Sequence, residues 1–169
     1  MKISLNPQAK DAATRDALVA EGGFGKYYTD HMVVCEWNEK DGWSEPELKP
    51  YGPISLDPAT AVFHYGQEIF EGMKAYRQPD GGIGLFRPEA NARRFAKSAN
   101  RLALPEMPEE LFIETVETLV KQDAGWVPNK VGESLYIRPF MFATEVGLGV
   151  RPSNKALYML IATPAGAYF

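Results

Sequence analysis

A tyrosine and an arginine two positions apart, Tyr136 and Arg138, could bind a small anion together. They lie in an expected strand over residues 134–143, so both side chains project from the same face of that strand. A hydroxyl beside a guanidinium is a pair that can bind a carboxylate. The residues alone leave a second interpretation open, in which a structural tyrosine stands beside an arginine that forms an ion pair.

Residues 64–74 form the densest group of polar and aromatic side chains in the sequence, with one histidine, one lysine and two carboxylates. Gly66 and Gly72 bracket a turn-like unit, and glycine is favoured where the backbone bends sharply or lies close to another group. This profile is typical of a loop shaped around a ligand. The alternative is an ordinary turn that enters a strand with its aromatic residues in the core.

Two neighbouring arginines, Arg93 and Arg94, lie in the first of two expected helices, which has Pro88 in its first turn. Apolar residues recur along one face of this helix, and basic residues lie on another. A guanidinium can form paired charge-assisted hydrogen bonds with phosphate oxygens. The alternative is a solvated basic face without a ligand.

These residues need a sheet and helices to position them, and the pattern predicts both. Short runs of strand-forming residues occur at 32–37, 43–48, 72–77, 83–87, 134–143 and 156–162, and a second helix begins at Pro108. We expect an α+β fold, a two-layer α/β sandwich. It would have a roughly six-stranded, mostly antiparallel sheet, with two main helices on one face. The other face would be open to a ligand or a partner.

Two expected strands carry more specific predictions. Residues 156–162 are nearly all apolar, which favours a central position in the sheet. Pro139 lacks a backbone donor and predicts an edge position or a bulge for its strand.

Composition excludes several kinds of function. The net charge of −4 argues against a nucleic-acid partner, which would need a basic face. Two histidines and one cysteine, Cys35, are scattered and do not predict a metal site or an internal disulfide. No apolar run approaches the roughly 18 residues of a membrane span, and the first residues do not resemble a signal peptide. A reducing cytoplasm is the expected compartment.

Three motifs in one order resemble the branched-chain aminotransferases, pyridoxal-phosphate enzymes of fold type IV. The motifs are residues 64–74, the run Leu-Tyr-Ile-Arg-Pro at 135–139, and Pro-Ala-Gly-Ala-Tyr-Phe at 164–169. The resemblance extends from about Phe24 to Phe169. It implies a small N-terminal domain over residues 24–163, preceded by an arm at 1–23 and followed by the start of an interdomain connection at 164–169. The second domain, which carries the family's Schiff-base lysine, is expected beyond this chain.

The resemblance also implies roles for individual residues. Arg94 would bind the phosphate of pyridoxal 5'-phosphate, because Arg87, Pro88, Asn91 and Arg94 match the pattern Arg-Pro-x-x-Asn-x-x-Arg. The implied substrate-binding residues are Phe24, Tyr65, Phe70, Tyr136, Arg138, Val150 and Tyr168. Tyr65 and Val150 would reach the site of a neighbouring subunit in a homodimer. His64, Glu68, Glu71 and Lys74 are interpreted as scaffold, since proton transfer belongs to the absent lysine.

The implied activity is transfer of the amino group of leucine, isoleucine or valine to 2-oxoglutarate, and this chain alone is expected to be inactive. Two alternatives stay open. One is another fold-type-IV enzyme, such as a D-amino-acid aminotransferase or an aminodeoxychorismate lyase, and the other is a non-catalytic domain that binds a partner through its open sheet face. The sequence does not rank the three branched-chain substrates, and it does not distinguish a biosynthetic from a degradative direction.

Overall fold

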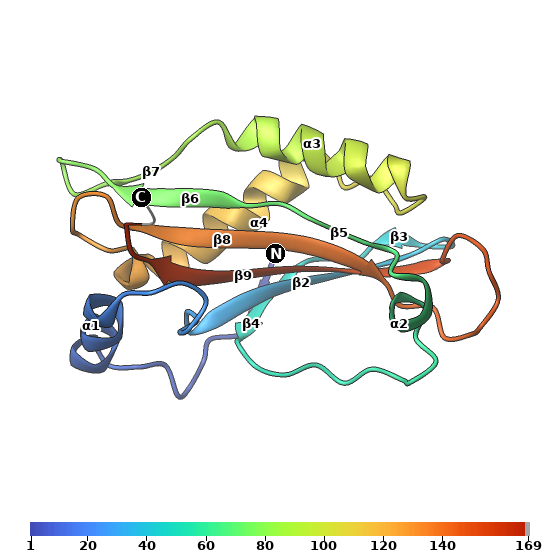
Figure 1. Ribbon diagram of the computed structural model, residues 1–169, viewed down its shortest axis with the longest axis horizontal. Coiled ribbons are helices and arrows are strands. Elements are labelled where there is room, and N and C mark those ends of the chain that lie inside the picture. The colour runs from blue at the N-terminus through green and yellow to red at the C-terminus, as the bar shows by residue number, and fades with distance from the viewer. Residues whose placement is uncertain (168–169) are drawn as a thin grey trace.

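The computed structural model describes residues 1–167 and contains one nine-stranded sheet with two long helices on one of its faces (Figure 1). The strands are β1 (Lys2–Ile3), β2 (His31–Asn38), β3 (Gly42–Trp43), β4 (Glu47–Pro50), β5 (Glu68–Phe70), β6 (Met73–Arg77), β7 (Ile83–Leu85), β8 (Ser134–Ala143) and β9 (Lys155–Ala165). The helices are α1 (Ala12–Glu21), α2 (Ala61–Tyr65), α3 (Pro88–Arg101), α4 (Glu109–Gln122) and the 3-10 turn η1 (Ala124–Trp126).

The sheet order is β1-β4-β2-β9-β8-β6-β7, with β3 paired to β2 and β5 paired to β8. Every pairing is antiparallel except that of β1 with β4. The expected α+β two-layer fold is therefore confirmed, and the central position of the 156–162 strand is confirmed as well. The expected strand count was too low, because the very short strands β1, β3 and β5 carry almost no periodicity.

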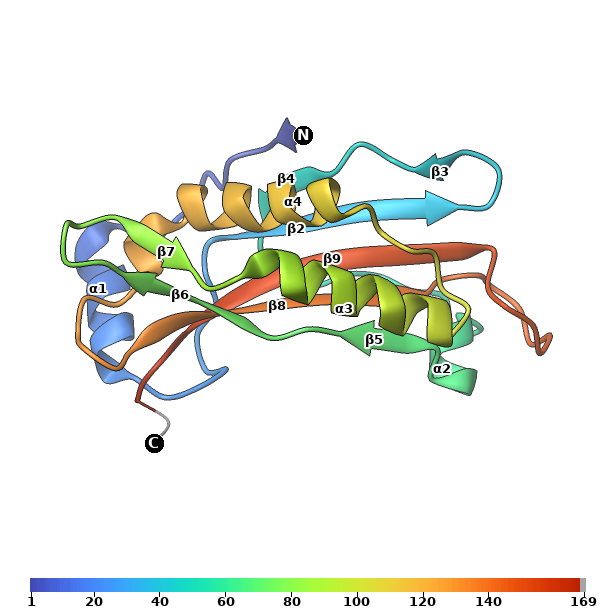
Figure 2. The same ribbon diagram turned by 90° about the horizontal axis from the view of Figure 1, so that it is seen from above.

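Alternation along β8 and β9 divides the sheet into two faces, which we call the helix face and the open face. On the helix face, Ile137 and Tyr158 are fully buried beneath α3 and α4, where Phe95 and Phe112 meet Tyr158. Figure 2 shows these two helices side by side over the sheet. On the open face, Phe142 and its neighbours form a second, smaller apolar cluster. Elsewhere on this face Phe70 is 64% exposed, so side chains there are available for a site.

The expectation of an edge position or a bulge at Pro139 was wrong, because β8 is an inner strand and keeps one register with each neighbour. β8 lies between β9 on one side and β5 and β6 on the other. The carbonyl of Pro139 accepts a hydrogen bond from the Glu71 amide (2.8 Å), but the proline has no N–H to return. The interruption between β5 and β6 falls at this point. Pro139 thus accounts for a break in the neighbouring strand.

The N-terminal arm is held against the domain by a hydrogen bond from its Asn6 backbone amide to the buried His31 side chain. His31 is buried, and its Nδ1 lies 2.6 Å from the Asp123 carboxylate, while its Nε2 accepts a hydrogen bond from the Asn6 amide (2.9 Å). The arm also contributes β1 to the sheet. At the other end of the described chain, β9 continues through Ala165, past the expected domain end at residue 163. The division into arm, domain and connection stays a prediction.

Candidate functional site

Four of the predicted substrate-binding residues form one contacting cluster on the open face. The Arg138 Nη2 donates a hydrogen bond to the Tyr136 hydroxyl (2.7 Å). The same guanidinium lies 4.4 Å from the centre of the Phe70 ring, a cation–π distance. Phe24 meets Tyr136 edge to face at 4.9 Å between ring centres. One cation and one hydroxyl are therefore placed among aromatic walls.

Arg138 has hydrogen-bonding capacity left over. Its Nε is buried and has no hydrogen-bond partner within the described residues. A buried N–H without a partner is costly, and such groups usually mark a functional site or an absent ligand. The arrangement of Tyr136 and Arg138 can hold a carboxylate, which would supply the missing acceptor.

Gly72 makes room for this cluster. It lies across from Arg138 in the sheet, since Phe70 pairs with Phe140 and Lys74 pairs with Tyr136. A Cβ on Gly72 would collide with the Tyr136 hydroxyl and lie 3.0 Å from the ring Cζ. The glycine is thus required by close approach and not by its backbone angles.

Arg94 lies on the helix face of the same sheet edge, where a buried carboxylate holds it. The Arg94 Nε donates to Glu71 Oε1 (2.5 Å), and its Nη2 donates to Glu71 Oε2 (2.6 Å). The Asn91 amide donates to the same Oε2 (2.9 Å). Only 3% of the Glu71 side chain is exposed, whereas 66% of the Arg94 side chain is exposed. Glu71 therefore binds one edge of the guanidinium and leaves the rest facing solvent.

The contact with Arg94 and Asn91 lowers the pKa of Glu71. Burial by itself would raise that pKa, because it disfavours the charged carboxylate. The hydrogen bonds from Arg94 and Asn91, together with the charge of Arg94, outweigh burial and hold the pKa of Glu71 below its ordinary value. The ion pair is consequently intact at neutral pH.

A groove of about 440 Å³ opens beside Arg94, between β5 and α3. Its lining is mostly cationic and apolar and consists of Glu68, Ile69, Phe70, Arg94, Lys97, Ser98, Arg101 and Leu102. Three cations against one carboxylate make the groove positive. This chemistry suits a phosphate group.

The remaining predicted residues lie apart from the cluster. The Tyr65 hydroxyl donates to the Leu148 carbonyl, and Val150, two residues further along that loop, is 85% exposed. Neither residue contacts Phe24, Phe70, Tyr136 or Arg138 through any ring contact or hydrogen bond within the described chain. Tyr168 lies outside the described residues.

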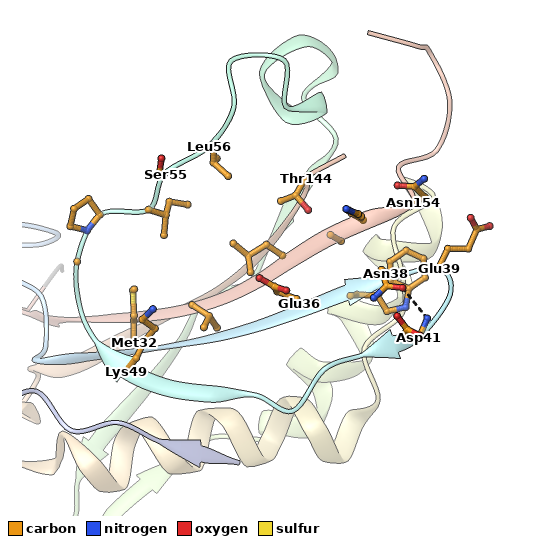
Figure 3. Close-up of a pocket in the computed structure, with 18 of the residues that line it drawn as sticks. Met32, Glu36, Asn38, Glu39, Asp41, Lys49, Ser55, Leu56, Thr144 and Asn154 are labelled. Carbon is orange, nitrogen blue, oxygen red and sulfur yellow. Dashed lines mark hydrogen bonds between the residues drawn. The ribbon is translucent and has the colours of Figure 1, made fainter. Parts of the chain in front are cut away.

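A larger concavity of about 970 Å³ lies elsewhere on the open face, between the sheet and the loop that follows β4. Figure 3 shows Met32 and Glu36 from β2, Lys49 from β4, and Ser55 and Leu56 from the facing loop. None of the predicted site residues lines it. This larger hollow is therefore separate from the candidate site.

Residues 1–167 contain neither a candidate metal site nor a candidate membrane-spanning helix. No group of three histidine, cysteine, aspartate or glutamate side chains there could hold a metal ion. None of the helices in that part of the chain is long and apolar enough to cross a membrane.

Comparison with known proteins gives a consistent result, although no family model matches the sequence. The branched-chain-amino-acid aminotransferase of Mycolicibacterium smegmatis is 58% identical over 168 residues, 99% of this chain and 46% of that protein. The branched-chain-amino-acid transaminase 1 of Bacillus subtilis is 48% identical over 147 residues, 87% of this chain and 41% of that protein. The chain is thus similar to branched-chain aminotransferases over nearly all of its own length. It spans less than half the length of these curated relatives.

Solved branched-chain aminotransferases share the fold. One such enzyme, crystallised with pyridoxamine 5'-phosphate, superimposes with a TM-score of 0.59 and 27% identity, over 80% of this chain and 41% of that one. The same enzyme complexed with 4-methylvaleric acid gives a TM-score of 0.56 and 28% identity, over 76% of this chain and 40% of that one. The expected fold is thus confirmed, and so is the resemblance to branched-chain aminotransferases.

Sequence reasoning missed the contacts that Glu71 makes with Arg94 and Asn91. Glu71 was interpreted as scaffold, and Asn91 only as part of a motif. Two signals were available. Alternation along residues 70–72 places Glu71 on the face opposite Phe70, and Asn91 precedes Arg94 by three positions, so both face the same side of a helix.

Proposed function

We propose that this chain is the N-terminal domain of a pyridoxal-phosphate enzyme that transfers the amino group of leucine, isoleucine or valine to 2-oxoglutarate. One observation carries the proposal. Phe24, Phe70, Tyr136 and Arg138, which the family resemblance assigns to one substrate pocket, form one contacting cluster on the open face. High identity to named branched-chain aminotransferases supports the same conclusion.

The residues around Arg94 fit the phosphate of the cofactor. Arg94 presents an exposed guanidinium edge beside a positive groove, and Glu71 fixes its orientation. A guanidinium held in this way can form paired hydrogen bonds with phosphate oxygens. When bound, pyridoxal phosphate supplies the electron sink for transamination, while the protein supplies position and charge.

The open-face cluster would orient the substrate. Phe24 and Phe70 offer apolar surface to a branched aliphatic side chain, which suits an apolar pocket. Arg138 and Tyr136 would neutralise a carboxylate, and the free Nε of Arg138 supports this role. The second carboxylate of glutamate or 2-oxoglutarate is the group that most needs a cation in such surroundings.

A homodimer belongs to the same proposal. Tyr65 and Val150 lie away from the cluster of their own chain, as residues that reach a neighbour's site would. Phe63, Leu148 and Val150 are all more than half exposed, and an exposed apolar patch favours association. A cytoplasmic location completes the proposal, supported by a lone cysteine that is free and buried.

The chain alone should not catalyse the reaction. The lysine that exchanges the proton is proposed to lie in the second domain, beyond residue 169. Within this chain, Lys74 belongs to the motif at residues 64–74, which is not the motif that carries the family's Schiff-base lysine. Tyr168 would stand on the connection to that second domain.

A substrate screen of the full-length protein tests the proposal against its alternatives. Purified protein loaded with pyridoxal phosphate is incubated with 2-oxoglutarate and leucine, isoleucine, valine, D-alanine or D-glutamate in turn, and glutamate or 2-oxo-acid formation is measured. Aminodeoxychorismate is assayed separately for pyruvate release. We expect turnover with the three branched-chain amino acids only. Turnover confined to D-amino acids or to aminodeoxychorismate would contradict the proposal, and a complete lack of turnover would favour a partner-binding domain.

A further inference from the structure

One buried carboxylate stands between the phosphate-binding arginine and the substrate cluster without a part in the proposed mechanism. Glu71 lies between Phe70 and Gly72, whose neighbours on the open face are Arg138 and Tyr136. Glu71 itself turns to the helix face, where Arg94 and Asn91 contact it. Phe70 and Gly72 therefore contact the cluster on the open face, while Glu71 between them contacts Arg94 on the helix face.

The Glu71 carboxylate accepts three hydrogen bonds, more than packing alone requires. Both carboxylate oxygens are occupied, one by Arg94 Nε and the other by Arg94 Nη2 and the Asn91 amide. The Glu71 backbone N–H donates to the Pro139 carbonyl (2.8 Å), and the Asn91 side-chain amide also donates to the Gly72 carbonyl (3.3 Å). The backbone of Glu71 is thus fixed by β8, and its carboxylate is fixed by α3.

Arg94 would otherwise be free to move. Its side chain is 66% exposed, and within the described residues its hydrogen bonds all go to Glu71. A long, exposed arginine loses considerable rotamer freedom when it binds a ligand, and fixing it beforehand reduces that cost. A bidentate contact also fixes the plane of the guanidinium.

We infer that Glu71 is the positioning residue that pre-orients Arg94 for the cofactor phosphate, with Asn91 holding Glu71 in turn. The inference rests on the proposed function, because it assumes that Arg94 meets the phosphate. It assigns Glu71 no contact with the cofactor. Its effect on ligand affinity should be confined to how strongly the protein prefers a phosphorylated ligand.

The test compares two ligands that differ only in the phosphate. Dissociation constants of pyridoxal phosphate and of pyridoxal are measured on the full-length apoprotein, and their ratio gives the phosphate preference. We expect Glu71→Gln to lower this preference about tenfold, a loss on the scale of one charge-assisted hydrogen bond. Arg94→Ala should lower it at least as much, and Glu71→Gln added to Arg94→Ala should lower it no further.

The chain offers a matched control on the same helix. Arg93, the neighbour of Arg94, pairs with Glu109 at 3.2 and 3.3 Å, but at the exposed surface. Glu109→Gln removes an arginine–glutamate pair away from the proposed phosphate site and should leave the preference unchanged. The ³¹P resonance of bound pyridoxal phosphate should move in Glu71→Gln as it does in Arg94→Ala, and should stay in place in Glu109→Gln.

The outcomes separate the inference from the function beneath it. If Glu71→Gln weakens both ligands equally, Glu71 is only a structural residue and the inference is wrong. If Arg94→Ala leaves the preference intact, the phosphate assignment itself fails. Should Glu71→Gln not fold, Asn91→Ala keeps the ion pair but removes one hydrogen bond to it, and we expect a smaller loss of preference, about threefold. An unchanged preference in that variant would overturn the inference.

Discussion

The Tyr136 hydroxyl occupies the space that a side chain on Gly72 would need. Gly72 has no left-handed backbone angle, so the conflict is purely steric. Either the tyrosine moves, and its hydrogen bond with Arg138 is broken, or the strand moves.

Gly72→Ala should therefore destabilise the chain by about 1–3 kcal/mol, the usual cost of overpacking, when urea unfolding is followed by circular dichroism. Gly52→Ala is the matched control, because a methyl group on Gly52 would have no atom within 4 Å and the backbone angle there is ordinary. It should change stability by less than about 0.5 kcal/mol. Equal effects of the two substitutions would contradict the steric account.

The end of α3 carries a residue in an unfavourable conformation. Ala103 has a φ of +53°, and the amide of Leu104 donates to the Ala99 carbonyl, as in a Schellman motif. Glycine adopts this conformation without steric cost, so Ala103→Gly should stabilise the chain by about 0.5–1 kcal/mol. Ala96→Gly makes the same chemical change inside the helix and should instead destabilise by about 1 kcal/mol. A loss of stability in both variants would refute the assignment.

The elements that position the site could be predicted because their signals are local. α3 and α4 follow from apolar periodicity and from proline and glutamate in their first turns, and β9 follows from its apolar run. Pro139 shows where such reasoning ends. The sequence shows that Pro139 has no backbone N–H to donate. It does not show that this position faces Glu71, between β5 and β6, where the neighbouring strand is interrupted.

The polar contacts of the site were not predictable in the same way. Glu71 binds Arg94 and Asn91, which are 23 and 20 positions away, and His31 binds Asp123 at a separation of 92. Such pairs depend on how the sheet and helices pack. The resemblance named the substrate residues, and the structure places Phe24, Phe70, Tyr136 and Arg138 in contact; their roles stay predictions.

Acid should weaken the contact between Glu71 and Arg94. The folded-state pKa of Glu71 lies below its ordinary value of 4.5, so the unfolded chain takes up the proton first as pH falls. The stabilisation is therefore complete above pH 4.5 and is lost as pH falls below that value towards the folded-state pKa. Urea unfolding at successive pH values should show a steeper acid loss in the wild type than in Glu71→Gln. Parallel curves for the two proteins would contradict this.

Arg138 should matter more for the dicarboxylic substrate than for leucine. Only glutamate and 2-oxoglutarate bring a second carboxylate, which is costly to bury without a partner. In the full-length enzyme, Arg138→Met should slow the glutamate half-reaction more than the leucine half-reaction, by about tenfold or more. Single-turnover absorbance measurements separate the two half-reactions. An equal loss in both would make Arg138 a general structural residue.

The central claim is that this chain supplies phosphate-binding and substrate-binding residues, while the cofactor-linked lysine lies in another domain. Borohydride reduction with pyridoxal phosphate, followed by peptide mass spectrometry, tests it directly on the full-length protein and on residues 1–169 alone. The account predicts one stoichiometrically labelled lysine in the full-length protein, outside residues 1–169, and only sparse labelling without turnover in the chain alone. Stoichiometric labelling of a lysine within this chain, such as Lys74, together with transaminase turnover, would contradict it.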